Sequence, residues 1–263
     1  MAPQDDQFFV ESVFHPSDFS KTSEHAFAHA LAIVLHRHTK LTILHAGQES
    51  RRERWMNFPS VRGTLERWGL LDGESPRRAV SHELAVKVKK VALKKTQPLS
   101  AVLDYLDEHP TDLIVLATEG REGLPRWIRP SMAERLARKT RTMTLFVSGT
   151  ARGFVSLENG NVTLRRILVP VDYYPKPSTA IAIAARAASL ATDQPVEITT
   201  LHVGDSEEPP RISLPDTPSC LWSRLQRSGD VIEEIVQTAT DQSADLIVMA
   251  TEGHDGILDA LRG

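Results

Sequence analysis

The stretch DLIVLATEGREG at residues 112–123 is an apolar run that ends in a loop with two glycines, and DLIVMATEGHDG at residues 245–256 nearly repeats it. Nine of the twelve positions are identical, among them the leading Asp and both glycines. Self-similarity of this extent indicates that one structural unit occurs twice in the chain. We therefore expect a fold made of two similar halves.

Two further pairs of stretches support this duplication. VFHPSDFS at residues 13–20 and ILVPVDYY at residues 167–174 share a Pro-x-Asp motif. LTILHAG at residues 41–47 and ITTLHVG at residues 198–204 share a Leu-His pair, which a glycine follows two residues later. All three pairs occur in the same order in both halves, so the sequence predicts a tandem duplication.

The composition is that of an ordinary soluble globular protein, with 263 residues of which 41% are hydrophobic and 25% charged. A net charge of −3 gives no basic field that would attract nucleic acid or an anionic membrane. The N-terminus lacks a secretory signal, and no apolar run is long enough to span a bilayer. Because Cys220 is the only cysteine, no internal disulfide forms, and we expect a cytoplasmic protein.

Apolar runs alternate with amphipathic helical patterns along each half. In the first half the patterns predict strands at residues 12–14, 40–46, 112–118 and 142–148, a further strand near 88–95, and helices at 22–38, 98–110 and 131–140. Strands that are separated by helices run parallel and are covered on both faces. The expected fold class is therefore α/β, with two tandem doubly wound domains.

The predicted domains comprise residues 1–150 and 151–263. The stretch at residues 148–166 is rich in Gly, Ser and Asn, which is typical of a linker. The Asn159-Gly160 pair within it predicts a hairpin turn.

The two halves differ in the connection that follows the Leu-His strand. Gly47 and Asp112 are 65 positions apart, whereas Gly204 and Asp245 are 41 apart, so the first half has 24 additional residues. We assign them to an insertion at about residues 48–71. Large apolar side chains recur there at helical spacing, namely Phe58, Val61, Leu65 and Trp68. The pattern predicts a short amphipathic helix packed on its own domain, and the alternative is a lid or a partner surface.

The repeated polar motifs all follow predicted strands, at the carboxyl ends where open parallel sheets bind ligands. Asp18 and Asp172 end the first strand of their halves, and each glycine loop ends a later strand. A carboxylate accepts hydrogen bonds from an adenine amino group or a ribose hydroxyl, and small residues let the backbone approach phosphates. This layout suits a nucleotide. The alternative is that the Asp caps the first helix and the glycines form a tight turn.

Together these motifs resemble the universal stress protein family, in two copies that cover nearly the whole chain. A strand that ends in Pro-x-Asp, a second that ends in Leu-His, and the DLIVxATxGxxG stretch carry the resemblance. It implies a five-stranded parallel sheet in the order 3-2-1-4-5 in each domain. It also implies that some members bind ATP through the Asp and a glycine-rich phosphate loop, whereas others bind no nucleotide.

In the first half the family's nucleotide-binding positions correspond to Asp18, Gly120, Gly123 and Ser131. Pro130 stands where the motif has its third glycine, and the spacer LPRWIR has six residues instead of nine. Proline has no N–H to offer a phosphate and adds a ring where the backbone has to approach closely. The first half therefore departs from the ATP-binding pattern.

In the second half the corresponding positions are Asp172, Gly253, Gly256 and Gly263. The third glycine is present, but the sequence given stops there, before counterparts of residues 131–147. We expect the second domain to lack its last helix and strand, as a truncated gene model would. A complete second domain is the better candidate for binding ATP.

Other residues give weaker indications of chemistry. His25 and His29 lie one helical turn apart, but no third ligand is nearby in the sequence, so no metal site is expected. His45 and His202 recur at matched strand ends, which favours a structural or crevice-lining role over catalysis. We find no nucleophile with its base and no Gly-Lys-Ser/Thr phosphate loop, so no catalytic residue is predicted.

The leading hypothesis is a cytoplasmic stress-response protein that acts as an adenine-nucleotide-binding or interaction module. Its partner would be an adenine nucleotide, with no nucleic acid and no membrane, and its domains would pair within one chain or in a homodimer. The alternatives are an enzyme that hydrolyses ATP or transfers an adenylyl group, and a scaffold that binds no nucleotide.

Overall fold

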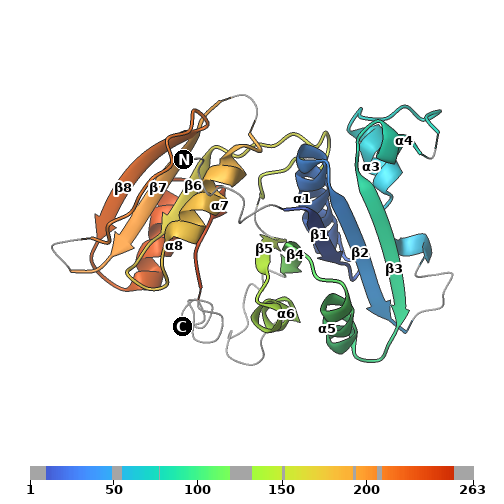
Figure 1. Ribbon diagram of the computed structural model, residues 1–263, viewed down its shortest axis with the longest axis horizontal. Helices are drawn as coiled ribbons and strands as arrows, with labels where there is room; N and C mark the ends of the chain where they lie inside the picture. Colours follow the sequence, from blue (N-terminus) through green and yellow to red (C-terminus); the bar gives the residue numbers. More distant parts are fainter. Residues whose placement is uncertain are drawn as a thin grey trace, which may run out of the picture. The chain divides into compact units, whose positions relative to one another are not determined.

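The structure, a computed structural model, describes residues 10–48, 55–76, 78–118, 132–149, 152–191, 194–205 and 209–251. Contacts within the chain divide it into two compact units, Met1–Asn161 and Val162–Gly263 (Figure 1). These units differ from the predicted domain ranges by residues 151–161, which pack with the first unit.

The first unit contains a five-stranded parallel sheet in the order β3-β2-β1-β4-β5. Its elements are β1 (Ser12–Pro16), α1 (Lys21–Arg37), β2 (Lys40–Gly47), α3 (Val61–Arg67), α4 (Ala79–His82), β3 (Lys87–Lys94), α5 (Pro98–Glu108), β4 (Leu113–Thr118), α6 (Met132–Thr140) and β5 (Met143–Ser148). The predicted fold class and the strand order 3-2-1-4-5 are confirmed for this unit. The strand predicted near residues 88–95 is present as β3.

The second unit contains a four-stranded parallel sheet in the order β8-β7-β6-β9. Its elements are β6 (Arg166–Pro170), α7 (Ser178–Ala188), β7 (Val196–Val203), β8 (Cys220–Arg227), α8 (Val231–Asp241) and β9 (Leu246–Ile247). This order is the order of the first four strands of the first unit. Residues 252–263, where we predicted a phosphate loop without a following helix and strand, lie outside the described residues.

Helices cover both faces of the first sheet, as the alternation of side chains along β1 shows. Phe14 points to one face, where it packs with Val102 and Leu106 of α5 and with Leu136 of α6. His15 points to the opposite face, where its ring lies near Phe27 of α1. Successive side chains of a strand alternate between faces, so β1 is buried on both sides.

The predicted insertion is the connection that carries the chain from β2 to the parallel strand β3. All four predicted helix-face side chains are buried, with exposed fractions of 0–7% for Phe58, Val61, Leu65 and Trp68. This confirms a helix packed on its own unit, because α3 contains Val61 and Leu65, and Trp68 is its C-cap. In the second unit, the described part of the β7–β8 connection contains no helix.

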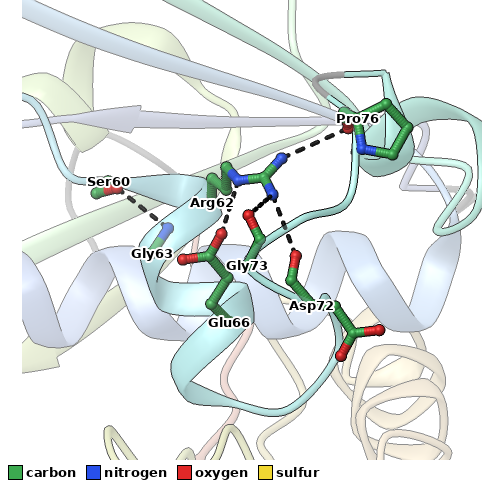
Figure 2. A network of polar contacts seen from close by, with 7 residues as sticks. All are labelled: Ser60, Arg62, Gly63, Glu66, Asp72, Gly73 and Pro76. Carbon is green, nitrogen blue, oxygen red and sulfur yellow. Dashed lines mark hydrogen bonds and ion pairs between the residues drawn. The ribbon is translucent and has the colours of Figure 1, made fainter.

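The guanidinium of Arg62 holds this connection together (Figure 2). Its Nε lies 2.6 Å from the Glu66 carboxylate, one helical turn along α3. Its terminal nitrogens donate to the backbone carbonyl oxygens of Asp72 and Gly73, at 3.1 and 3.0 Å, and to that of Pro76 at 3.5 Å. The planar guanidinium offers five donors, so one side chain fixes the returning loop against the helix.

The leading Asp of the repeated stretch fixes β4 against β1. The Oδ2 atom of Asp112 accepts hydrogen bonds from the backbone N–H groups of Glu11 and Ser12, at 3.0 and 2.9 Å, and from the Ser12 hydroxyl at 2.8 Å. The backbone N–H of Asp112 donates back to the Ser12 carbonyl oxygen at 3.3 Å. One carboxylate therefore joins the beginnings of two strands that are 100 residues apart.

The second unit repeats this arrangement with different neighbours. The Oδ2 atom of Asp245 accepts from the backbone N–H groups of Arg165 and Arg166, at 2.8 and 3.0 Å. The backbone N–H of Asp245 donates to the Arg166 carbonyl oxygen at 2.9 Å. From the sequence we assigned no role to either Asp. Their recurrence at the first position of both copies was the feature that could have indicated one.

His15 connects three elements from the centre of the first unit. Its side chain is fully buried, its Nδ1 lies 3.0 Å from the Val115 carbonyl oxygen, and its Nε2 lies 3.2 Å from the Ser23 hydroxyl. The ring therefore donates to β4 and accepts from α1 while it is neutral. Burial lowers the pKa of His15 to about 4, and its bond to Val115 and the charge of Asp18 only partly oppose this.

We expect the Asp112→Ala variant to lose about 1–3 kcal/mol of unfolding free energy, because the N–H groups of Glu11 and Ser12 lose a charged acceptor. Urea unfolding of the first unit measures the loss. Asp104→Ala, which removes an exposed carboxylate from α5, is the matched control and should change stability by less than about 0.5 kcal/mol. Equal effects of the two substitutions would contradict the role of Asp112.

We expect His15 to make the protein less stable in acid. The unfolded chain binds a proton near pH 6.5 and the folded chain only near pH 4, so stability is complete above pH 6.5 and falls as the pH falls toward 4. The loss over this window is about 3 kcal/mol. Urea unfolding between pH 4.5 and 7.5 should show a shallower pH dependence for His15→Gln than for the unchanged protein. Parallel curves would show that His15 is not the titrating group.

Candidate functional site

The two Pro-x-Asp motifs lie at the carboxyl ends of the first strand of each sheet, where the structure places Asp18 after β1 and Asp172 after β6. Each of these strands has one neighbour on either side, β2 and β4 in the first unit and β7 and β9 in the second. In such sheets the ligand crevice forms where the connections leave the central strands toward opposite faces. Both carboxylates stand at this place. The predicted phosphate-loop residues lie outside the described residues, namely Gly120, Gly123, Ser131, Gly253, Gly256 and Gly263.

Asp18 takes part in the turn that starts α1. Its Oδ1 atom accepts a hydrogen bond from the Ser20 N–H at 2.9 Å, and the Ser20 hydroxyl accepts one from the Ser23 N–H at 3.1 Å. Ser20 is thus the N-cap of the helix, and Asp18 supports the residue that caps it. The alternative named Asp18 as the cap of the helix, but the cap is Ser20, and Asp18 contributes to the turn before it.

His45 lies at the carboxyl end of β2 and fixes the same turn. Its Nδ1 atom lies 2.7 Å from the Ser17 carbonyl oxygen, so the ring holds the residue that precedes Asp18. Phe19 stacks on this ring with centroids 3.8 Å apart, and Phe58 packs edge-on against Phe19 at 5.3 Å. In the first unit, Phe19 therefore covers one face of the histidine, and Phe58 packs against Phe19.

His202 makes the equivalent contact in the second unit, but its neighbours differ. Its Nδ1 atom lies 3.2 Å from the Val171 carbonyl oxygen and 3.9 Å from Oδ1 of Asp172. The side chain of Asp172 is 60% exposed, and its Oδ1 accepts from the adjacent Tyr173 N–H at 2.7 Å. The helix that follows begins only at Ser178 and has no side-chain cap. Asp172 therefore does not serve the start of a helix, in contrast to Asp18.

The Nε2 atom of His202 is a buried polar atom with no hydrogen-bond partner in the part of the chain that the structure describes. The side chain is 5% exposed. Because Nδ1 faces a carbonyl oxygen, it carries the proton of the neutral ring, and Nε2 is left as an acceptor. Gly204 comes close to it, since a Cβ at that position would lie 3.2 Å from Nε2.

Two tyrosines follow Asp172 and are open to solvent. Tyr173 is 49% exposed and Tyr174 77% exposed. The ring of Tyr173 stands edge-on to the His202 ring, with centroids 5.8 Å apart. The second unit thus brings together a carboxylate, an unpaired imidazole acceptor and two aromatic rings at the carboxyl ends of β6 and β7.

The other candidates from the sequence have structural roles. His29 is buried, with its ring bonded to the backbone of His25 and of Phe154, so it is not one of a pair of metal ligands. Within the described ranges, no three His, Cys, Asp or Glu side chains come together as a metal site would require. Cys220 is a buried free cysteine. None of the helices in those ranges has the length and apolar character needed to cross a membrane.

Comparison with known proteins agrees with the fold. The model of the universal stress protein family matches residues 12–148. A universal stress protein from Archaeoglobus fulgidus DSM 4304 aligns with 93% of this chain and 88% of its own, at 13% identity and a TM-score of 0.56. A functionally unknown protein from Pseudomonas aeruginosa PAO1 aligns with 97% of this chain and 86% of its own, at 16% identity and a TM-score of 0.57.

A universal stress protein in complex with cAMP aligns with 52% of this chain and 96% of its own, at 19% identity and a TM-score of 0.39. A search of the curated proteins found no match. The matched residues 12–148 make up more than half of the 263 residues and include every strand of the first sheet. The chain belongs to the universal stress protein family.

Proposed function

We propose that the protein is a stress-response protein that binds an adenine nucleotide in the crevice of its second unit. The observation that carries this proposal is that Nε2 of His202 has no hydrogen-bond partner among the described residues, while the exposed carboxylate of Asp172 lies 3.9 Å from Nδ1 of the same ring. A buried acceptor without a partner costs about 1–3 kcal/mol. A ligand that donates a hydrogen bond there recovers this cost, which the folded protein otherwise bears.

The polar groups of this crevice select a ligand with hydrogen-bond donors. The carboxylate of Asp172 and Nε2 of His202 are both acceptors. The exocyclic amino group of adenine and the hydroxyls of ribose are donors that match them. A base with a carbonyl oxygen in place of the adenine amino group would bring an acceptor opposite the acceptors of Asp172 and His202.

The aromatic side chains provide a surface for a flat base. Tyr173 and Tyr174 directly follow Asp172 and are exposed. Aromatic rings stack on planar partners in offset or edge-on arrangements and contribute about 0.5–1.5 kcal/mol beyond the buried area. A purine placed there would contact a ring and the two acceptors together.

The phosphates would lie at the glycine loop that follows β9, where Gly253, Gly256 and Gly263 stand at the three glycine positions of the family's phosphate loop, with a spacer of six residues as in the first half. In the first unit, Pro130 interrupts the same motif between Gly123 and Ser131. The involvement of Asp18 in the start of α1 also supports a structural role for that unit. We therefore assign the nucleotide to the second unit.

We propose binding without catalysis, because within the described residues no three His, Cys, Asp or Glu side chains come together to hold a metal ion, and the Ser23 hydroxyl that bonds to His15 is buried. The protein would work in the cytoplasm, with its units paired within one chain or in a homodimer. Release of ADP or AMP that requires Asp172 would contradict this part of the proposal.

Calorimetric titration with ATP tests the proposed site. We expect Asp172→Ala and His202→Phe each to weaken binding about tenfold, because Asp172→Ala removes a carboxylate acceptor and His202→Phe removes the Nε2 acceptor together with the Nδ1 bond to Val171. Asp18→Ala is the matched control from the first unit and should leave the affinity unchanged. Loss of binding in Asp18→Ala with full binding in Asp172→Ala would place the site in the other unit and contradict the proposal.

The same titration tests the choice of base. We expect GTP to bind at least about tenfold more weakly than ATP, because its O6 is an acceptor where the amino group of adenine donates. His202→Phe should reduce this preference, since it removes one of the two acceptors that impose it. Equal affinities of the unchanged protein for ATP and GTP would show that Asp172 and His202 do not discriminate between the two bases.

A further inference from the structure

The segment between the two sheets packs on the first unit. Phe154 and Val155 are 4% and 5% exposed, as buried as core residues of the sheet. The turn that follows closes through a bond from the Ser156 N–H to the Asn161 carbonyl oxygen at 2.9 Å and one from the Gly160 N–H to the Ser156 carbonyl oxygen at 2.9 Å. This confirms the turn predicted at Asn159-Gly160. The segment is attached at two places.

The first attachment is His29, which lies in the middle of α1 and is 1% exposed. Its Nδ1 atom lies 2.8 Å from the His25 carbonyl oxygen and therefore carries a proton. Its Nε2 atom accepts a hydrogen bond from the Phe154 N–H at 3.0 Å. The ring of Phe154 packs edge-on against the imidazole, with centroids 4.6 Å apart. The neutral ring thus joins the helix to the segment.

Gly153 lets the backbone come close to this ring. Gly153 has a φ of +68°, and a Cβ at this position would lie 2.6 Å from Cε1 and 2.7 Å from Nε2 of His29. The glycine is needed both for its backbone conformation and for the close approach. The backbone at Gly153 is in contact with the edge of the ring that accepts the hydrogen bond.

The surroundings of His29 disfavour a positive charge. Burial is the main cause of its lowered pKa, the positive charge of His25 adds to it, and the bond to the His25 carbonyl oxygen opposes it. Arg152, near the start of the segment, is exposed. The strands that pack against α1 carry few titratable groups, namely His15 on β1, Lys40 and His45 on β2, and none on β4 or β5. His15 faces Ser23 and Phe27.

The second attachment contains no group that titrates in this range. The indole Nε1–H of Trp68, just after α3, donates to the Leu157 carbonyl oxygen at 3.1 Å. Gly160, with a φ of +72°, lies against the face of the same indole, where a Cβ would come within 2.5 Å of the ring. This contact does not depend on pH, so it provides an internal reference for the first one.

We propose that His29 is a proton-operated latch, which holds Gly153–Val155 on α1 while its ring is neutral and releases them when the ring gains a proton. A proton on Nε2 would set an N–H against the Phe154 N–H, so that two donors face each other without an acceptor. It would also leave a charge inside a site that is almost fully buried, which is costly without a partner. Release restores water to the charged ring. The attachment of the segment to Trp68 would then remain.

Amide hydrogen exchange, followed by NMR on the full chain between pH 7.5 and 5.5, tests the latch. After correction for intrinsic exchange rates, we expect the protection of the Phe154 amide to fall below pH 6.5 by up to about tenfold for each pH unit. The Gly160 amide should show no such fall. Any loss of global stability acts on both amides, so the ratio of their protection factors isolates the latch. A ratio that is constant with pH would overturn the proposal.

A pair of variants separates the proton from the contact. His29→Gln offers a side-chain oxygen near the position of Nε2 but does not titrate, so the Phe154 amide should keep the same protection at pH 5.5 and 7.5. His82→Gln, which replaces an exposed histidine of α4, is the control. In this variant the protection of the Phe154 amide should decrease toward pH 5.5 as it does in the unchanged protein. If the protection of the Phe154 amide still decreases with pH in His29→Gln, another group causes the release and the proposal is wrong. If His29→Gln does not fold, the ratio of Phe154 to Gly160 protection in the unchanged protein still decides.

Discussion

Each sheet depends on one carboxylate that joins the beginning of its first strand to the beginning of its fourth. Asp112 and Asp245 each accept two backbone N–H groups through a single oxygen, and each donates its own N–H back to the strand. The two strands are about 80–100 residues apart in sequence, so the loop between them has to close at an entropic cost. The carboxylate offsets part of this cost and sets the register. The crevice lies at the other end of the same strands, and its geometry follows from that register.

Residue patterns were sufficient to predict the elements, and the resemblance to the family implied the strand order, but neither showed the atoms that join the strands. Parallel strands with crossover helices leave a strong periodic pattern, and the recurrence of three motifs located the same strands in both halves. Hydrogen bonds between distant residues leave no such pattern. Asp112 binds Ser12, His15 binds Val115 and His29 binds Phe154, and in each case the partner is about 100 or more residues away. These contacts could be found only once the chain was folded.

At the candidate site, too, the sequence predicted some features, while others are seen only in the structure. Recurrence correctly singled out His45 and His202, and both hold the backbone of the residue before the Asp. The sequence did not show that the two rings have different surroundings. Phe19 stacks on His45, whereas Tyr173 meets His202 edge-on and Nε2 of His202 has no partner in the described part of the chain. The two sites begin with the same motif but differ after the Asp, where Phe19 and Ser20 stand in the first unit and Tyr173 and Tyr174 in the second. The helical connection that brings Phe58 to the first unit adds to this difference.

The assignment of ligand binding to the second unit is the central claim, and amide chemical shifts during an NMR titration with ATP test it most directly. We expect the amides of residues 171–174 and 202–204 to shift in a saturable manner, while those of residues 17–20 and 45–47 stay in place. Shifts that are confined to residues 17–20 and 45–47, or no saturable shift in either set, would contradict the claim.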